Sequence, residues 1–231
     1  MYNFKGIKPE TIDLLCLNSF NDSKSFYEEH KEELKQGATV PMRQIMLDLA
    51  DMMTQIDDKM YTDPIYTVSR IRRDTRRTKN KMMYRENLWI MFRRNKKLYP
   101  NAPFFWFEFR PDSYNYGIGF FVQRPAQFDE LRKLILKHPR KWLSAVASAE
   151  KAGMKFGSYN VYKNDRVPDA PENLKKYLNA KDMSFMYTGL DISRIGSPKL
   201  IDELKAAYTA AEPMYRFMIE AYENIIAEDL L

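Results

Sequence analysis

The chain has 231 residues, of which 45% are apolar and 29% charged, a composition typical of folded rather than disordered proteins. Its 8 glycines are too few for collagen, flexible linkers or glycine-rich phosphate loops, and a single cysteine excludes an intrachain disulfide. No run approaches the roughly 18 apolar residues that cross a membrane. The length and the lack of a proline-, glycine- or serine-rich linker predict one domain, 1–231. A start without a secretory signal predicts a cytoplasmic protein.

The N-terminal part of the chain is predicted to be helical. A proline in a first-turn position and an Asn or Asp cap mark helix starts, and Gly37 is predicted to end the second helix. Methionines at helical spacing in the third helix are predicted to fill the core. Cys16 lies in an apolar helical pattern and is predicted to be a buried core thiol. The predicted helices are 9–19, about 23–35 and one from near Pro41.

After about residue 60 the sequence alternates between strand-like and helical segments. A segment rich in β-branched residues and several aromatic segments are typical of strands, and Asp112–Asn115 supplies the turn of a hairpin. Pro139 separates two adjacent helices, and Pro213 is expected to kink or split the final helix. The predicted strands are 65–73, 87–93, 104–110, 116–123, 156–163 and 183–190, and the predicted helices are about 126–137, 139–152, 171–179 and one that opens at 197–198.

Helices therefore cluster at both ends of the chain, and strands occupy the middle. This order predicts an α+β fold, with a mostly antiparallel central sheet packed by helices from the N- and C-terminal thirds. The strand at 104–110 is apolar on both faces, as expected of a central strand that is covered on both sides. Gly117 and Gly119 lie inside a strand pattern, where small residues allow close packing or a bulge.

The positive charge is concentrated in one window. The net charge of the chain is +6, but residues 69–97 alone carry +10, so the remainder carries −4. Such crowded like charges repel one another unless acidic helices of the fold or an anionic ligand compensate them. The window contains Asp74 and Glu86 against twelve cations: Arg70, Arg72, Arg73, Arg76, Arg77, Lys79, Lys81, Arg85, Arg93, Arg94, Lys96 and Lys97.

Several familiar site chemistries are missing from the sequence. The two histidines, His30 and His138, have no partner at metal-ligand spacing, which argues against a zinc site. No Walker-type phosphate loop is present, and no helix follows the glycines of 117–119 as a dinucleotide-binding loop requires. No serine nucleophile elbow occurs either, and no motif names a cofactor.

The segment 70–85 resembles the motif of a family of bacterial and fungal proteins, the domain of unknown function 2461 family. That motif reads Arg-Ile-x-Arg-Asp-x-Arg-Phe-Ser-x-x-Lys-x-Pro-Tyr-Lys. Thr78 and Arg85 are close replacements in it, whereas Arg77 stands in place of Phe and Met83 in place of Pro. The resemblance spans 2 to about 225 and implies a fold rather than an activity. The direct matches are Arg70, Ile71, Arg73, Asp74, Arg76, Lys81 and Tyr84.

The motif has the chemistry of an anion-binding site. Arginine forks, a lysine point charge and a phenol together suit phosphate, sulfate or carboxylate. Asp74 is expected to hold an arginine bidentately, and a carboxylate clamped in this way stays ionised and is a poor proton donor. Binding is therefore better supported than catalysis. The predicted ligand-binding residues are Arg70, Arg73, Asp74, Arg76, Lys81, Tyr84 and Arg85.

Three interpretations of the segment follow. The first is a binding site for a small phosphorylated ligand or a nucleic-acid backbone, to which Arg93, Arg94, Lys96 and Lys97 would add. The second is an enzyme acting on a phosphorylated or carboxylated metabolite, with Asn18, Tyr84 and Asp74 as catalytic candidates. The third is purely structural: an Arg73–Asp74 salt bridge locks a turn, and solvent covers the other cations.

Overall fold

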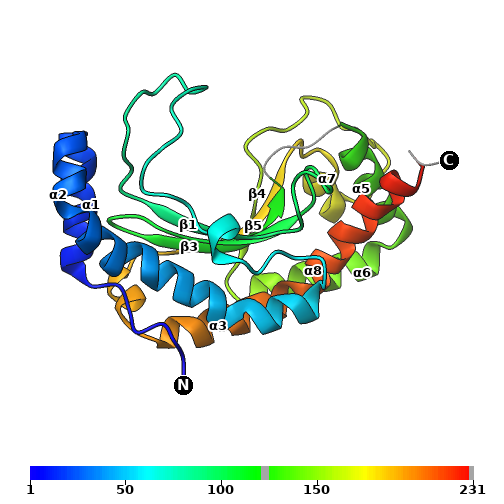
Figure 1. Ribbon diagram of the computed structural model, residues 1–231. Helices are drawn as coiled ribbons and strands as arrows, with labels where there is room; N and C mark the ends of the chain where they lie inside the picture. Colours follow the sequence, from blue (N-terminus) through cyan, green and yellow to red (C-terminus); the bar gives the residue numbers. More distant parts are fainter. Residues whose placement is uncertain (121–124, 229–231) are drawn as a thin grey trace. The chain divides into compact units, whose positions relative to one another are not determined.

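The computed structural model describes residues 1–120 and 125–228. Five strands form one antiparallel sheet of order β1-β2-β3-β5-β4 that is packed by helices, and the predicted α+β fold is confirmed (Figure 1). The strands are Leu88–Phe92 (β1), Phe104–Phe109 (β2), Tyr114–Phe120 (β3), Lys155–Gly157 (β4) and Met183–Gly189 (β5). The helices are Pro9–Asn21 (α1), Lys24–Leu34 (α2), Val40–Ile56 (α3), Pro64–Thr67 (α4), Pro125–Lys137 (α5), Pro139–Lys151 (α6), Glu172–Leu178 (α7) and Lys199–Glu228 (α8), with a π-helical turn at Lys35–Thr39 (η1) and a 3-10 turn at Ile192–Gly196 (η2).

The chain divides into two compact units. Unit 1 comprises Met1–Phe92, Trp106–Tyr116 and Thr188–Lys205. Unit 2 comprises Arg93–Phe105, Gly117–Tyr187 and Ala206–Leu231. β1 belongs wholly to unit 1 and β4 wholly to unit 2, while the residues of β2, β3 and β5 are divided between the units. The single domain expected over 1–231 stays a prediction.

The core of unit 1 forms where α3 packs against β1 (Figure 1). Asp48 of α3 also ties down the N-terminal segment, because its carboxylate accepts the backbone N–H groups of Asn3 at 2.9 Å and Phe4 at 2.8 Å. The apolar residues of α3 recur at helical spacing and line its buried face, so the predicted core role is confirmed for its methionines except Met52, which is half-buried. The buried residues are Met42, Ile45, Met46, Leu49, Met53 and Ile56.

The core of unit 2 is aromatic. Trp142 of α6 is fully buried, with ring centroids 5.3 Å from Tyr177 and 5.1 Å from Phe217. Gly119 lies so close to the backbone carbonyl of Met183 that any side chain would collide with it. The predicted close packing at Gly119 is therefore confirmed, because a side chain at this position of β3 would collide with the backbone of β5.

Most predicted elements are present, but the predicted strand at 65–73 is wrong. Pro64 opens a short helix instead, and the Asp63 side chain caps it by accepting the backbone N–H of Ile65 at 2.8 Å. A proline after a capping aspartate favours a helix start, and this local signal overrides the β-branched composition. The predicted strand at 156–163 is also shortened to β4. Residues 121–123 of another predicted strand lie outside the described residues.

The predicted end of the second helix at Gly37 is wrong, and the final helix is not split at Pro213. Gly37 does not end the second helix, because the chain passes through η1 directly into α3. Gly37 instead lets Thr11 of α1 approach closely, since a side chain at Gly37 would collide with that threonine. Pro213 lies inside α8, which continues on both sides of it. The neighbouring Met214 and Tyr215 are buried, and their burial offsets the hydrogen bond that proline removes.

Candidate anion-binding site

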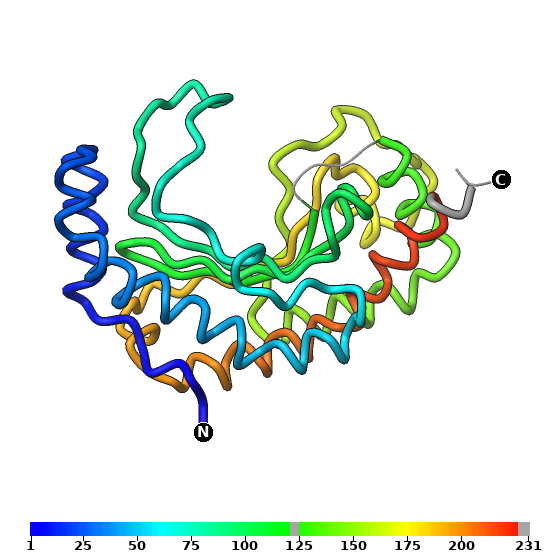
Figure 2. Tube along the Cα trace, in the orientation of Figure 1, coloured from blue at the N-terminus to red at the C-terminus, as the bar shows by residue number. Residues whose placement is uncertain are grey.

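The basic hairpin, defined as residues 70–85, projects from the start of β1 in unit 1. Its arms are joined by an antiparallel bridge between Arg72 and Tyr84 and by a hydrogen bond from the backbone N–H of Arg73 to the carbonyl of Met83 at 2.7 Å. Figure 2 shows the two arms side by side next to α1 and α2. The residues first predicted as a strand therefore form one arm of an irregular hairpin.

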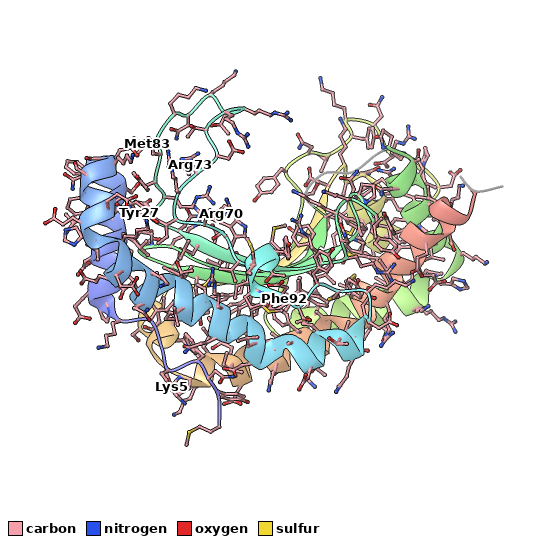
Figure 3. The ribbon with its side chains drawn as sticks, viewed as in Figure 1. Lys5, Tyr27, Arg70, Arg73, Met83 and Phe92 are labelled. Atoms are coloured by element: carbon pink, nitrogen blue, oxygen red, sulfur yellow. The ribbon has the colours of Figure 1, made fainter. Side chains whose placement is uncertain are left out.

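The hairpin is anchored to the helices of unit 1. Asp22 follows α1 in the left-handed conformation with φ 43°, and its Oδ1 accepts the backbone N–H groups of Met83 at 2.6 Å and Tyr84 at 3.1 Å. The ring of Tyr84 is 1% exposed and stacks on Tyr27 of α2 at 4.7 Å between centroids. Figure 3 places Tyr27 beside the arm that carries Met83, while Arg70 and Arg73 lie on the opposite arm. The position of the arms is thus set by buried and hydrogen-bonded groups.

The tip of the hairpin is closed by its own side chains. Asp74 holds Arg76 bidentately, with Nε at 2.9 Å from Oδ1 and Nη2 at 2.7 Å from Oδ2. This pair holds the pKa of the Asp74 carboxyl well below its usual value, first through the side-chain hydrogen bond from Arg76 and then through its backbone N–H. The expected bidentate clamp is confirmed, and its arginine is Arg76. The structural interpretation had required Arg73 as the partner of Asp74. Lys81 donates to the carbonyl of Thr75 at 3.0 Å.

Arg73 and Arg85 have no acidic partner among the side chains that the structure describes. Burial lowers the pKa of the half-buried Arg85 guanidinium, and the positive charge of Arg73 lowers it further. Arg85 also lies over the ring of Trp89, 4.4 Å from the centroid. Two neighbouring like charges with no described carboxylate within ion-pair distance create a place where an anion is stabilised.

One of the eight cations in the hairpin is paired with a described carboxylate. Across residues 1–120 and 125–225, whose side chains the structure describes, the hairpin contributes one ion pair, Arg76 with Asp74. The other seven cations have no carboxylate within ion-pair distance among those side chains. These are Arg70, Arg72, Arg73, Arg77, Lys79, Lys81 and Arg85.

The predicted site residues are therefore brought together only in part. Arg73 and Arg85 approach each other, and Arg70 is exposed near the base of the same arm as Arg73. Asp74 and Arg76 are paired at the exposed tip, and Tyr84 is an anchor whose pKa is raised by burial. Arg94 does not extend the footprint, because it is 5% exposed in unit 2 and bound to Glu223 at 2.7 Å.

The catalytic candidates do not form a constellation. Asp74 is exposed and clamped, and Tyr84 is buried in its stack. Asn18 is fully buried, and neither polar atom of its side chain has a hydrogen-bond partner in the described part of the chain. No group of three or more His, Cys, Asp or Glu side chains suited to a metal ion occurs among the described residues. None of the described helices is long and apolar enough to span a bilayer.

Sequence reasoning missed Glu108, the acidic residue inside the aromatic strand β2. Its carboxylate is 16% exposed and accepts the side-chain amides of Asn87 at 2.5 Å and Asn115 at 3.1 Å. Asn115 is itself oriented by the indole N–H of Trp106 at 2.8 Å. The signal was available, because β2 reads Phe-Phe-Trp-Phe-Glu-Phe and a lone charge in such a strand needs polar partners.

Cys16, expected to be a buried core thiol, is only half-buried. Burial and the charges of Glu86 and Asp13 raise its pKa above the ordinary value of 9.0. Because the thiolate is the reactive form, we expect iodoacetamide to modify Cys16 at pH 8 more slowly than cysteine in an unfolded peptide. Mass spectrometry across a pH series measures the rate, which should still rise above pH 9 and be faster in Glu86→Gln. A plateau below pH 9 would contradict this expectation.

The fold and the hairpin define an α+β protein in which a cationic hairpin extends the edge strand of an antiparallel sheet. The family model described as "Conserved hypothetical protein (DUF2461)" matches residues 10–217. The chain belongs to this family, and the resemblance predicted from the motif is confirmed. Searches of the curated proteins and of the solved structures find no match.

Proposed function

We propose that the protein binds an anionic phosphate group, carried by a small phosphorylated ligand or by a nucleic-acid backbone, at the basic hairpin. Arg73 and Arg85 form the centre of the site, and Arg70 lies on the arm that carries Arg73. The observation that carries the proposal is that Arg73 and the half-buried Arg85 lie close enough for the charge of Arg73 to lower the pKa of Arg85, with no carboxylate within ion-pair distance of either among the described side chains. A bound phosphate would accept hydrogen bonds from both guanidiniums and offset their charge.

The burial of Arg85 adds to this support. A guanidinium held over Trp89 and half-removed from water has less freedom to choose another partner, so less entropy is lost when an anion binds. The anchors at Asp22 and Tyr84 fix the arms before any ligand arrives. Binding to a preorganised pair of this kind is stronger than binding to mobile surface lysines.

The proposal is tested by titrating the protein with inorganic phosphate, a nucleoside monophosphate, and short single-stranded and duplex DNA. Each titration is repeated at about 50 mM and about 200 mM salt, because a backbone bound through many phosphates loses affinity steeply over this range. A small phosphorylated ligand at about 100 times its Kd should raise the free energy of unfolding by about 2.7 kcal/mol. No binding of any probe at the lower salt concentration would overturn the proposal.

A matched control separates site binding from general charge attraction. Arg43 is an exposed arginine on α3 and belongs to the same unit as the hairpin. Arg43→Gln changes the net charge by the same amount as a single arginine substitution in the hairpin. It should leave the affinity for phosphate within about twofold. An equal loss in Arg43→Gln and Arg73→Gln would mean that net charge alone attracts the anion.

A further inference from the structure

The side chains of Arg85, Asn87 and Trp89 share one face of the chain. The Arg85 guanidinium lies 4.4 Å from the centroid of the Trp89 ring, and Asn87 and Trp89 are the less buried residues on either side of Leu88. The burial of β1 agrees, since Leu88 and Ile90 are fully buried whereas Trp89 is half-exposed. The anion-binding arginine therefore leads directly onto the less buried face of the edge strand.

On that face Asn87 contacts Glu108 of the neighbouring strand. Oε1 of Glu108 accepts the Asn87 amide at 2.5 Å and lies 3.3 Å from the Arg110 guanidinium. Oε2 has a single donor within the described residues, the Asn115 amide at 3.1 Å. A carboxylate oxygen accepts about two hydrogen bonds, so Oε2 keeps one acceptor position. The side-chain amide oxygen of Asn87 has no hydrogen-bond donor in the described part of the chain. It supplies a second acceptor position.

We infer that Glu108 and Asn87 form a hydrogen-bond-accepting subsite next to the arginine pair, and that the ligand is a phosphorylated sugar with free hydroxyl groups. This inference rests on the proposed function, because the phosphate is placed at Arg73 and Arg85. Acceptors that are fixed and half-buried stabilise only a ligand that brings O–H or N–H donors, and they disfavour a bare anion. A nucleic-acid backbone lacks such paired donors beside each phosphate.

The spacing fits this class of ligand. Arg85 and Asn87 are two residues apart in the chain, so their Cα atoms are at most about 7 Å apart. A sugar ring places its hydroxyls at a similar distance from a terminal phosphate. Trp89 lies on the same face and holds the Arg85 guanidinium over its ring. One ligand can therefore meet the cationic pair and the two acceptors together.

The test compares inorganic phosphate with ribose 5-phosphate by calorimetric titration. The native protein should bind ribose 5-phosphate about tenfold more tightly than phosphate, because hydrogen bonds to a charged acceptor add to the phosphate contacts. Glu108→Gln should reduce this preference to about threefold or less while leaving phosphate affinity within about twofold. Asn87→Ala, which removes the other acceptor, should have the same selective effect and serves if Glu108→Gln melts far below the native protein.

The outcomes separate the two proposals. Phosphate binding without a preference for ribose 5-phosphate overturns the subsite and leaves the anion site standing. A loss of both affinities by the same factor in Glu108→Gln and Asn87→Ala also overturns the subsite, since the residues would then act on the fold. Failure of the native protein to bind either compound overturns the subsite and the small-ligand form of the proposed function, and the DNA titrations then decide the nucleic-acid form. A titration with adenosine monophosphate shows whether the sugar phosphate belongs to a nucleotide. Tighter binding of adenosine monophosphate than of ribose 5-phosphate would identify the ligand as a nucleotide.

Discussion

Replacing Tyr84 by alanine is expected to lower the free energy of unfolding by about 3–5 kcal/mol, the range for removing a large aromatic side chain from a core. Tyr84 is 1% exposed, and its ring stacks on Tyr27 at 4.7 Å and 23° between planes. The stack holds the hairpin against α2, so its loss removes one of the two anchors described above, the other being Asp22. Urea unfolding monitored by far-UV circular dichroism measures the change.

The matched control keeps the ring and removes the hydroxyl. Tyr84→Phe should unfold within about 1 kcal/mol of the native protein, because the stacking surface is unchanged. Tyr84→Ala should also weaken phosphate binding, since the arm that carries Arg85 loses its anchor. A variant Tyr84→Ala that is as stable as the native protein would show that the hairpin does not depend on this stack.

The architecture could be predicted because local signals and the global fold agree over most of the chain. Apolar residues of α3 recur at helical spacing and do line its buried face. The aromatic composition of β2 and β3 predicts strands, and both strands lie inside the sheet. The order of helices and strands along the chain then restricts the fold to an antiparallel sheet with helices on it.

Prediction failed where one residue type serves two structural purposes. Glycine commonly ends a helix, yet Gly37 is needed for the close approach of Thr11, and the helical path continues through a π turn. Proline commonly breaks a helix, yet Pro213 lies within α8. In both cases tertiary packing decides, and packing partners distant in sequence cannot be deduced from one segment.

The candidate site was predictable in composition but not in pairing. The charge window identified the hairpin, but it could not tell that Asp74 would pair with Arg76 or that Tyr84 would be buried. It also could not join Glu108 to Asn87, because these residues are 21 positions apart and meet only through strand pairing. Charge counts locate an anion site, whereas the fold decides which cations are left without partners.

A structural role and a binding role for the hairpin arginines predict different effects of substitution. A structural role predicts a loss of stability, and a binding role predicts a loss of affinity. Cations that lock a fold are paired with carboxylates, and their removal destabilises the protein. In the described structure only Arg76 is paired in this way, and the tip it closes is exposed. Arg73 instead has no carboxylate within ion-pair distance among the described side chains, and its charge lowers the pKa of Arg85. Stability and affinity should therefore respond differently to the same substitution.

The double substitution Arg73→Ala and Arg85→Ala is expected to weaken phosphate binding by about 10²- to 10⁴-fold, since each hydrogen bond to a charged group contributes about 1.5–3 kcal/mol. The melting temperature without phosphate should stay within a few degrees of the native value, because removing two neighbouring like charges offsets the lost contact between Arg85 and Trp89. Calorimetric titration and thermal unfolding measure the two quantities on one sample. A double variant that melts far lower but keeps its phosphate affinity would assign the arginines to folding, and the anion site would have to be abandoned.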